Sequence, residues 1–402
     1  MKIVVIGGGA AGFFAALKAK ESNTQAEVLL IESSAKLLSK VKISGGGRCN
    51  VTHACFDPKI LVQNYPRGKK ELLGPFNRFQ PKDTIAWFEK RGIKLEVEKD
   101  GRMFPVTDSS STIINCFLNE AKKLNVDILT LTKLVSIEKK KDKFQLSIKN
   151  GSPILADRVV LATGSSPIGW EIAKILGHKI NDPVPSLFTF NIPSFQLTSI
   201  AGVSVERAKI SLKNTKLEQK GPLLITHWGF SGPAALKLSA FGARFLAENN
   251  YKASLVIDWL IDLSLTELQN QIENERISHP KKALKNLQIP LPKSLLKELY
   301  LRASLQSDQL LRSLNKKDIT RLCETLKQDV YEIHGKTTNK DEFVTCGGIK
   351  LSEVNFKTME SKLCENLFFC GEILDIDGVT GGFNFQNAWT TGWIAGKSAS
   401  TK

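Results

Sequence analysis

The sequence has no long hydrophobic run and no recognisable metal or disulfide pattern. No stretch of 18 apolar residues occurs, so we expect no transmembrane helix. The first residues already read as a strand and a glycine turn, without the charged and apolar regions of a secretory signal. The seven scattered cysteines include no C-x-x-C pair, and the five histidines show no metal-ligand spacing. These absences predict a cytoplasmic protein with reduced thiols and without a membrane span or a metal.

Length and charge give two further expectations. A chain of 402 residues, 42% of them hydrophobic, is long enough for two or three domains. Its net charge of +16 is concentrated in residues 36–94, with 13 basic and four acidic side chains, and in residues 281–320, with nine and three. Two basic regions favour a polyanionic partner. The alternative is a lysine-rich chain that places charge on every solvated face.

The first 32 residues carry a dinucleotide-binding motif. A short apolar strand, Met1 to Ile6, leads into the glycine turn Gly7-Gly-Gly-Ala-Ala-Gly12, and a helix follows. Gly7 permits the tight turn, Gly9 lets the backbone approach a pyrophosphate, and Gly12 lets the helix pack close to the strand. Glu32, at the end of the next apolar strand, is placed to accept a hydrogen bond from a ribose 2′-hydroxyl. A carboxylate there repels a 2′-phosphate, so the motif predicts FAD or NAD rather than NADP.

Two more glycine-rich segments predict cofactor contacts. Gly45-Gly-Gly47 brings the backbone close to a ligand, and Arg48 beside it is suited to donate to a phosphate or a flavin carbonyl. Near the C-terminus, a strand, a loop, the turn Gly381-Gly382 and a helix return the chain to the first domain. Asp377 in that loop is a candidate for a ribityl hydroxyl, and ordinary closure of the fold is the alternative. No second G-x-G-x-x-G occurs, so we expect no separate nicotinamide domain.

The middle of the chain reads as an insertion. A buried strand ends at Gly164, Pro183-Val-Pro185 marks a boundary, and the segment up to about residue 345 is first β-rich and then helical. It contains the loop Thr226-His-Trp-Gly-Phe-Ser-Gly-Pro233, which opens a helix expected over 234–246. From residue 264 the pattern turns helical, with Ser264 and Glu267 placed as a capping box.

Four separated segments together resemble one bacterial flavoprotein family, labelled BaiN/RdsA-like and described as NAD(P)/FAD-dependent oxidoreductases. They are Gly7 to Gly12, Ser44-Gly-Gly-Gly-Arg-Cys-Asn-Val-Thr52, the loop 226–233, and Gly371-Glu-Ile-Leu-Asp-Ile-Asp-Gly-Val-Thr-Gly-Gly-Phe-Asn384. The resemblance spans the whole chain. It departs from the family at Ser165, where glycine is usual, and at Trp228 and Phe385, where smaller or different apolar residues are common.

The resemblance implies an α/β fold: a glutathione-reductase-like Rossmann FAD-binding domain with an inserted β-barrel-like domain and a small helical domain. The expected boundaries are 1–186 and 346–402 for the FAD-binding domain, 187–260 and 329–345 for the β-rich domain, and 261–328 for the helical subdomain. FAD contacts are implied, beside the motif residue Gly12, at Gly7, Gly9, Ala11, Glu32, Lys40, Arg48, Val135, Gly164, Glu372, Asp377, Gly382 and Asn384.

The implied chemistry is reduction of an activated carbon–carbon double bond by hydride transfer from reduced flavin. NAD(P)H would serve as a reductant that docks transiently. Members of such families act on uracil in ribosomal RNA or on dehydro-bile-acid enones, and older labels include amine oxidation. RNA suits the basic regions 36–94 and 281–320 best. A small-molecule enone reductase, an amine oxidase and a non-catalytic FAD-stabilised RNA-binding factor remain alternatives, and the oligomeric state is open.

The reaction also needs an acid to protonate the α-carbon, and two side chains are candidates. Cys49 follows Arg48 and the glycine run, where a positive neighbour would hold a usable thiol. His227, in the loop 226–233, is the second candidate. The alternatives are a small buried residue packed under the cofactor for Cys49, and a loop histidine held by its own backbone for His227.

Overall fold

A computed structural model describes residues 1–337 and 344–401, which form two compact units. The first comprises Met1–Val184 and Asn339–Lys402, and the second comprises Pro185–Thr338. The chain therefore leaves its first unit, builds a second one and returns. The three-part division with a separate helical subdomain stays a prediction.

The first unit is built on a seven-stranded sheet in the order β20-β21-β22-β10-β1-β2-β6. Neighbouring strands from β22 to β6 are parallel, while β20 and β21 pair antiparallel at one edge. The β1 residues Ile3, Val4 and Val5 are fully buried, as expected for a parallel strand covered on both faces. The strands are β1 (Lys2–Ile6), β2 (Glu27–Ile31), β6 (Asp127–Leu129), β10 (Arg158–Leu161), β20 (Val354–Asn355), β21 (Glu360–Ser361) and β22 (Leu367–Phe369).

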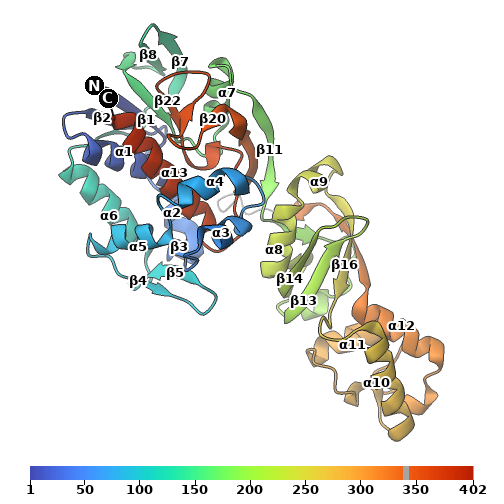
Figure 1. The fold of residues 1–402 in the computed structure, drawn as a ribbon. Coiled ribbons are helices and arrows are strands. Elements are labelled where there is room, and N and C mark those ends of the chain that lie inside the picture. The colour runs from blue at the N-terminus through green and yellow to red at the C-terminus, as the bar shows by residue number, and fades with distance from the viewer. Residues whose placement is uncertain (338–343, 402) are drawn as a thin grey trace. The chain divides into compact units, whose positions relative to one another are not determined.

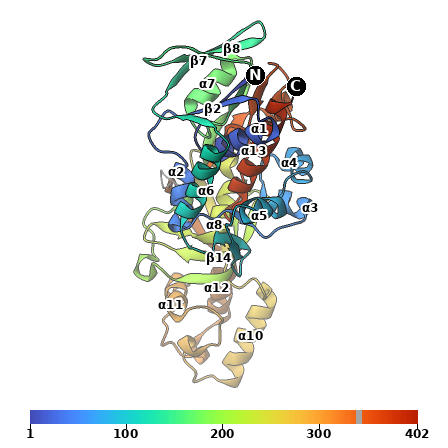
Figure 2. The same ribbon diagram turned by 90° about the vertical axis from the view of Figure 1, so that its left-hand side faces the viewer.

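Helices from the two ends of the chain lie side by side in this unit. Figures 1 and 2 both show α1 (Ala10–Ser22), in blue, against α13 (Phe383–Ser400), in red. Two glycines of α13 make this approach possible. A Cβ added at Gly396 would meet the Ala15 carbonyl oxygen at 2.2 Å, and one at Gly392 would meet the Ala11 oxygen at 2.6 Å. The close pairing of the chain ends thus depends on residues without side chains.

Smaller elements complete the first unit. Three-stranded sheets form from β3, β5 and β4 and from β7, β8 and β9, and β11 pairs with β19 where the chain leaves and re-enters. The elements are β3 (Thr52–His53), β4 (Leu95–Val97), β5 (Arg102–Pro105), β7 (Leu134–Lys140), β8 (Lys143–Ile148), β9 (Ile154–Ala156), β11 (Ile180–Ser186), β19 (Val344–Ile349), α2 (Ser39–Ile43), α3 (Pro58–Leu61), α4 (Lys69–Phe76), α5 (Pro81–Glu89), α6 (Ser110–Lys123) and α7 (Pro167–Ile175), with short 3-10 turns η1 (Ser44–Gly47), η2 (Val62–Asn64), η6 (Leu351–Glu353) and η7 (Gly371–Ile373).

The second unit contains a seven-stranded sheet in the order β17-β16-β13-β14-β15-β12-β18. Its two edge strands are separated only by Gly335, whose carbonyl accepts from Asn191 N at 3.3 Å while its N–H donates to Tyr251 O at 2.9 Å. One residue therefore joins the two ends of the sheet, which gives the β-barrel-like form that was expected. The strands are β12 (Thr189–Asn191), β13 (Ser204–Leu212), β14 (Glu218–Ile225), β15 (Gly229–Ser231), β16 (Lys252–Asp258), β17 (Asp329–His334) and β18 (Lys336–Thr337).

Helices and strands of the second unit share one hydrophobic core, which includes Phe230, Trp259, Leu299 and Leu322. The predicted capping box exists: Ser264 Oγ accepts from Glu267 N, and Glu267 Oε2 accepts from Ser264 N. The single helix expected over 234–246 is wrong, because the chain breaks at Gly242 into two helices. The helical elements are α8 (Gly232–Phe241), α9 (Ala243–Glu248), α10 (Leu265–Ser278), α11 (Lys293–Arg302) and α12 (Lys316–Lys327), with η3 (Thr198–Ile200), η4 (Leu284–Asn286) and η5 (Leu311–Ser313).

Within the two described stretches, no helix combines the length and apolarity that a bilayer crossing requires.

Candidate cofactor site

The turn between β1 and α1 has the geometry of a dinucleotide-binding loop. Gly7 adopts a φ of +113°, and a Cβ added at Gly12 would meet the Gly7 oxygen at 1.9 Å. A Cβ at Gly9 would meet no atom within 4 Å, so this backbone borders open space. Glu32 Oε2 accepts from Gly8 N at 2.9 Å, and its other oxygen accepts from Ser34 N at 2.8 Å. The carboxylate is thereby fixed beside the turn.

Residues from distant segments of the first unit meet at this turn. Lys40 Nζ forms an ion pair with Glu372, whose other oxygen accepts from Thr345 N at 3.0 Å. A Cβ at Gly164 would lie 3.8 Å from Glu372 Oε2, and one at Gly371 would lie 2.7 Å from Ala11 Cβ. The structure therefore brings together five predicted cofactor positions: Ala11, Lys40, Gly164, Glu372 and, through the turn, Gly9.

Asp377 is held differently from what the sequence indicated. The side chain is fully buried, and Arg67 binds it with two nitrogens, Nε at 2.5 Å from Oδ1 and Nη2 at Oδ2. Both carboxylate oxygens are thus engaged by a guanidinium. The predicted ribityl contact stays a prediction, and Arg67 is a residue that sequence reasoning missed. No local signal points to it, because its partner lies 310 residues away.

The second glycine turn is cross-linked at its base. Asn384 accepts from Gly378 N at 2.8 Å and donates to Gly378 O at 2.9 Å. Gly382, with a φ of +87°, caps α13, and a Cβ there would meet the Thr52 oxygen at 2.6 Å. With its amide oriented to satisfy both neighbours, Asn50 accepts from Gly382 N and donates to Thr52 O, each at 3.0 Å. The segment after the glycine run 45–47 therefore holds the turn that starts α13.

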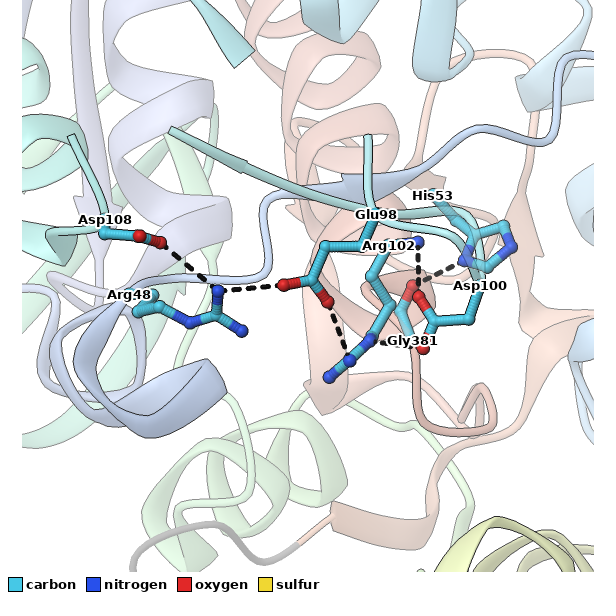
Figure 3. Close-up of polar contacts among 7 residues, drawn as sticks. All are labelled: Arg48, His53, Glu98, Asp100, Arg102, Asp108 and Gly381. Carbon is cyan, nitrogen blue, oxygen red and sulfur yellow. Dashed lines mark hydrogen bonds and ion pairs between the residues drawn. The ribbon is translucent and has the colours of Figure 1, made fainter. Parts of the chain in front are cut away.

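Charged side chains hold the segment around Arg48, as Figure 3 shows. Arg48 Nη1 lies 2.8 Å from Glu98 Oε1 and 3.2 Å from Asp108 Oδ1, and its guanidinium stacks on the Phe104 ring at 3.9 Å. Glu98 also binds Arg102 at 2.7 Å. These carboxylates raise the pKa of Arg48, Glu98 most strongly. The Arg48 guanidinium is thus paired with two carboxylates in this structure. Its predicted contact with a phosphate or flavin carbonyl stays a prediction.

His53 is a further residue that sequence reasoning missed. Its Nδ1 lies 3.1 Å from the Gly381 oxygen, and its ring stacks on Phe383 with centroids 4.6 Å apart (Figure 3 shows the Gly381 contact). The same ring packs under Gly101, where a Cβ would meet Nε2 at 2.6 Å. His53 therefore links the β4–β5 hairpin to the second glycine turn.

The two candidate acids lie in different units. Cys49, in the first unit, is fully buried with a φ of +66°, and burial raises its pKa to about 12. His227, in the second unit, is exposed in the loop between β14 and β15. Val135, a predicted FAD contact, is 51% exposed on β7. The roles of all three stay predictions.

The residues of the first unit fit FAD. Backbone at Gly9, Gly46 and Gly47 borders space in which an added Cβ would meet nothing within 4 Å. The hydroxyls of Thr163 and Thr345, beside Gly164 and Glu372, are buried and have no hydrogen-bond partner in the described part of the chain. Open backbone and unsatisfied buried polar atoms in the same unit are features that a bound cofactor would complete. Gly7, Gly12 and Glu32 supply the dinucleotide-binding geometry.

Comparison with known proteins agrees with this site. The family model described as HI0933-like protein Rossmann domain matches residues 1–398. A ribosomal RNA dihydrouridine synthase of Escherichia coli K12 is 32% identical over 416 residues, covering 98% of each chain. A 3-dehydro-bile acid delta(4,6)-reductase of Clostridium scindens is 26% identical, covering 100% of this chain and 99% of the relative.

Solved structures show the same fold at low identity. A 3-ketosteroid-delta4-(5alpha)-dehydrogenase from Rhodococcus jostii RHA1 superposes with a TM-score of 0.52 at 13% identity, covering 100% of this chain and 96% of that one. The full-length family match and the dinucleotide-binding geometry lead to one conclusion: the chain belongs to the HI0933-like Rossmann-domain family and is an FAD-dependent oxidoreductase.

Proposed function

We propose that this protein reduces a uracil base in ribosomal RNA to dihydrouracil. The observation that carries the proposal is the 32% identity to a ribosomal RNA dihydrouridine synthase across 98% of both chains. A match of that extent includes both glycine turns and the whole inserted unit. The substrate would place the enzyme in the cytoplasm, where ribosomal RNA is modified.

Residues of the first unit would hold the cofactor. Gly9 and the N-terminus of α1 would hold the pyrophosphate, and the fixed Glu32 carboxylate would accept from the ribose. Lys40, Glu372 and the N-terminus of α13 would hold the rest of the FAD molecule. Bound FAD supplies hydride chemistry for an activated double bond. NAD(P)H, docking transiently, is the proposed source of reducing equivalents.

Of the two candidate donors of the proton to the α-carbon, we favour His227 over Cys49. The imidazole of His227 is exposed to solvent and able to meet a substrate, whereas the Cys49 thiol is fully buried. A pKa of about 12 keeps Cys49 protonated at neutral pH but makes it a weak donor. We expect His227→Gln to lower kcat about 10²- to 10⁴-fold. Cys49→Ser, with its matched small polar side chain, should keep kcat close to the wild-type value.

The test in cells uses ribosomal RNA from a strain lacking the gene. Dihydrouridine measured by mass spectrometry should vanish in that strain and return with the wild-type gene. A Glu32→Ala gene should fail to restore it, because the ribose contact is lost, while Lys149→Gln, an exposed change elsewhere in the first unit, should restore it. Unchanged dihydrouridine in the deletion strain would refute the proposal.

A second candidate function, reduction of a small-molecule enone, is favoured by the full-length match to the bile-acid reductase. The purified protein separates the possibilities. Anaerobic bleaching of the flavin by NADH or NADPH, followed by reoxidation with a cyclic enone rather than with RNA, would favour this candidate. Rapid oxygen consumption with a soluble amine would favour an amine oxidase. A protein whose Glu32→Ala variant still supports growth would favour a non-catalytic factor.

A further inference from the structure

The side chain of Trp228 is more exposed than that of any other tryptophan in the chain. It is 50% exposed, whereas Trp170, Trp259 and Trp389 are buried and the two remaining tryptophans of the chain are partly buried. His227, next to it, is also exposed, with the two ring centroids 6.2 Å apart. A large aromatic side chain left in water has a cost that binding of a partner removes.

The loop that carries Trp228 is held rigidly in the second unit. Thr226 N and Oγ1 both donate to Gly229 O, at 2.8 and 2.9 Å, which closes the turn between β14 and β15. The Trp228 oxygen accepts from Ile192 N at 2.8 Å, which ties the loop to the segment after β12. A Cβ at Gly229 would meet the Phe190 oxygen at 2.1 Å, so glycine permits this close approach. The backbone beneath the indole is therefore fixed before any ligand arrives.

The net positive charge of the second unit indicates which kind of partner would bind there. Residues 185–337 carry 21 lysines and arginines against 14 aspartates and glutamates. On α11, Lys293 and Lys297 are exposed on one face, four residues apart, and Lys316 and Lys317 are exposed at the start of α12. A rigid aromatic platform on a positively charged unit is the combination that binds single-stranded nucleic acid. An acidic partner protein would need the lysines but not the indole.

We infer that Trp228 is a stacking platform for an unpaired RNA base. The inference rests on the proposed function and adds to it a residue of the second unit that binds the unpaired RNA strand. A base that is to react must leave its stack, and an aromatic ring offers it a replacement surface. Because any base has a π-face, Trp228 contributes affinity for an unpaired strand rather than for a sequence.

The test measures binding of a labelled single-stranded uridine oligonucleotide to the FAD-loaded protein. Trp228→Ala should weaken binding about 5- to 150-fold, as expected for loss of one stacked base. Trp228→Phe should keep most of the affinity, and Phe241→Ala, another exposed aromatic of the same unit, should change nothing. The slope of affinity against salt concentration should stay unchanged in Trp228→Ala, because stacking releases no counterions.

Fluorescence gives an independent readout. The oligonucleotide should quench the emission that Trp228→Phe removes, and a fully paired duplex of equal length should not. Unaltered affinity in Trp228→Ala, or quenching by a cyclic enone but not by RNA, would overturn the inference. If ribosomal dihydrouridine is independent of the gene while the oligonucleotide still quenches Trp228, the proposed function fails and the stacking platform stands.

Discussion

Glycines of the first turn have different roles although they are close in sequence. Gly12 is packed, since an added Cβ would lie 1.9 Å from the Gly7 oxygen, while Gly9 borders open space. We expect Gly12→Ala to lower the melting temperature of the FAD-free protein, because α1 must move away from β1. Gly9→Ala should leave that temperature nearly unchanged but weaken FAD binding at least tenfold. Thermal unfolding with and without FAD, with flavin absorbance, measures both effects.

The two variants serve as controls for each other. Equal melting temperatures of the FAD-free Gly12→Ala and wild-type proteins would contradict the packing role of Gly12. Unaltered FAD affinity in Gly9→Ala would contradict the pyrophosphate contact.

A buried carboxylate in the second unit gives a second prediction at this scale. Asp329 is 3% exposed and accepts from Arg302, Tyr331 and Trp259, and burial raises its pKa although Arg302 opposes the shift. Arg302→Met would leave a buried charge without its cation and should destabilise this unit by about 3–5 kcal/mol. Chemical denaturation, monitored by tryptophan fluorescence, would measure this loss of stability.

The double variant Arg302→Met with Asp329→Asn is the matched comparison, because it removes the charge as well as its partner. Its loss of stability should be smaller than that of Arg302→Met alone. A double variant less stable than the single one would show that the charge pair is not what stabilises this region.

Among the elements, the end of α7 is tied to the β20–β21 hairpin by His178. Its Nε2 lies 2.8 Å from Ser361 Oγ and its Nδ1 lies 3.2 Å from Glu353. Burial lowers the pKa of His178, and Glu353 opposes this only in part. The unfolded chain therefore takes up a proton near pH 6.5 while the folded chain does not. The free energy of unfolding should fall as the pH drops below about 6.5, by up to ~1.4 kcal/mol per pH unit.

Urea denaturation at several pH values between 5 and 8 would measure this fall. His178→Gln, which keeps a polar side chain toward Ser361, should remove most of it. An equally steep fall in that variant would assign the effect to other groups.

Elements were predictable where the signal was local. The capping box at Ser264 and Glu267 and the Rossmann turn are each encoded by residues that are close together in the sequence. The break at Gly242 was missed, because an apolar pattern continues through it and only the packing against Leu238 and Leu212 shows the change in direction. The ion pair between Arg67 and Asp377 could not be predicted from the sequence, because the two residues are far apart in the chain and meet only in the folded protein.

Across the whole molecule, the basic regions divide into two kinds of residue. Arg48, Arg67, Arg91 and Arg302, counted among the basic side chains of the sequence, are held in ion pairs within the fold. The exposed charge comes mainly from lysines, as on α11 and at the start of α12. The charge counted within the two basic regions therefore overstated what is available to RNA, because the carboxylates that pair with these arginines lie outside the regions.

These lysines predict a salt dependence at the molecular scale. Each of Lys293→Gln, Lys297→Gln and Lys317→Gln should reduce the slope of log affinity against log salt for single-stranded RNA by about 0.7 to 1. Lys149→Gln, on the first unit outside both basic regions, should leave the slope unchanged. Binding titrations at four salt concentrations would measure these slopes. Identical slopes for all four variants would exclude a role of these lysines in RNA binding.

The pairing of β10 with β22 and of α1 with α13 has a consequence for synthesis. Val159 lies beside Leu367 in the sheet, and Gly396 packs on Ala15, so the first unit is incomplete until the segment that holds Leu367 and Gly396 has been translated. The second unit, continuous in sequence, can form while the amino-terminal portion waits as an unfinished sheet on the ribosome. Flavin loading is therefore a late event, and the waiting portion is a natural client for chaperones.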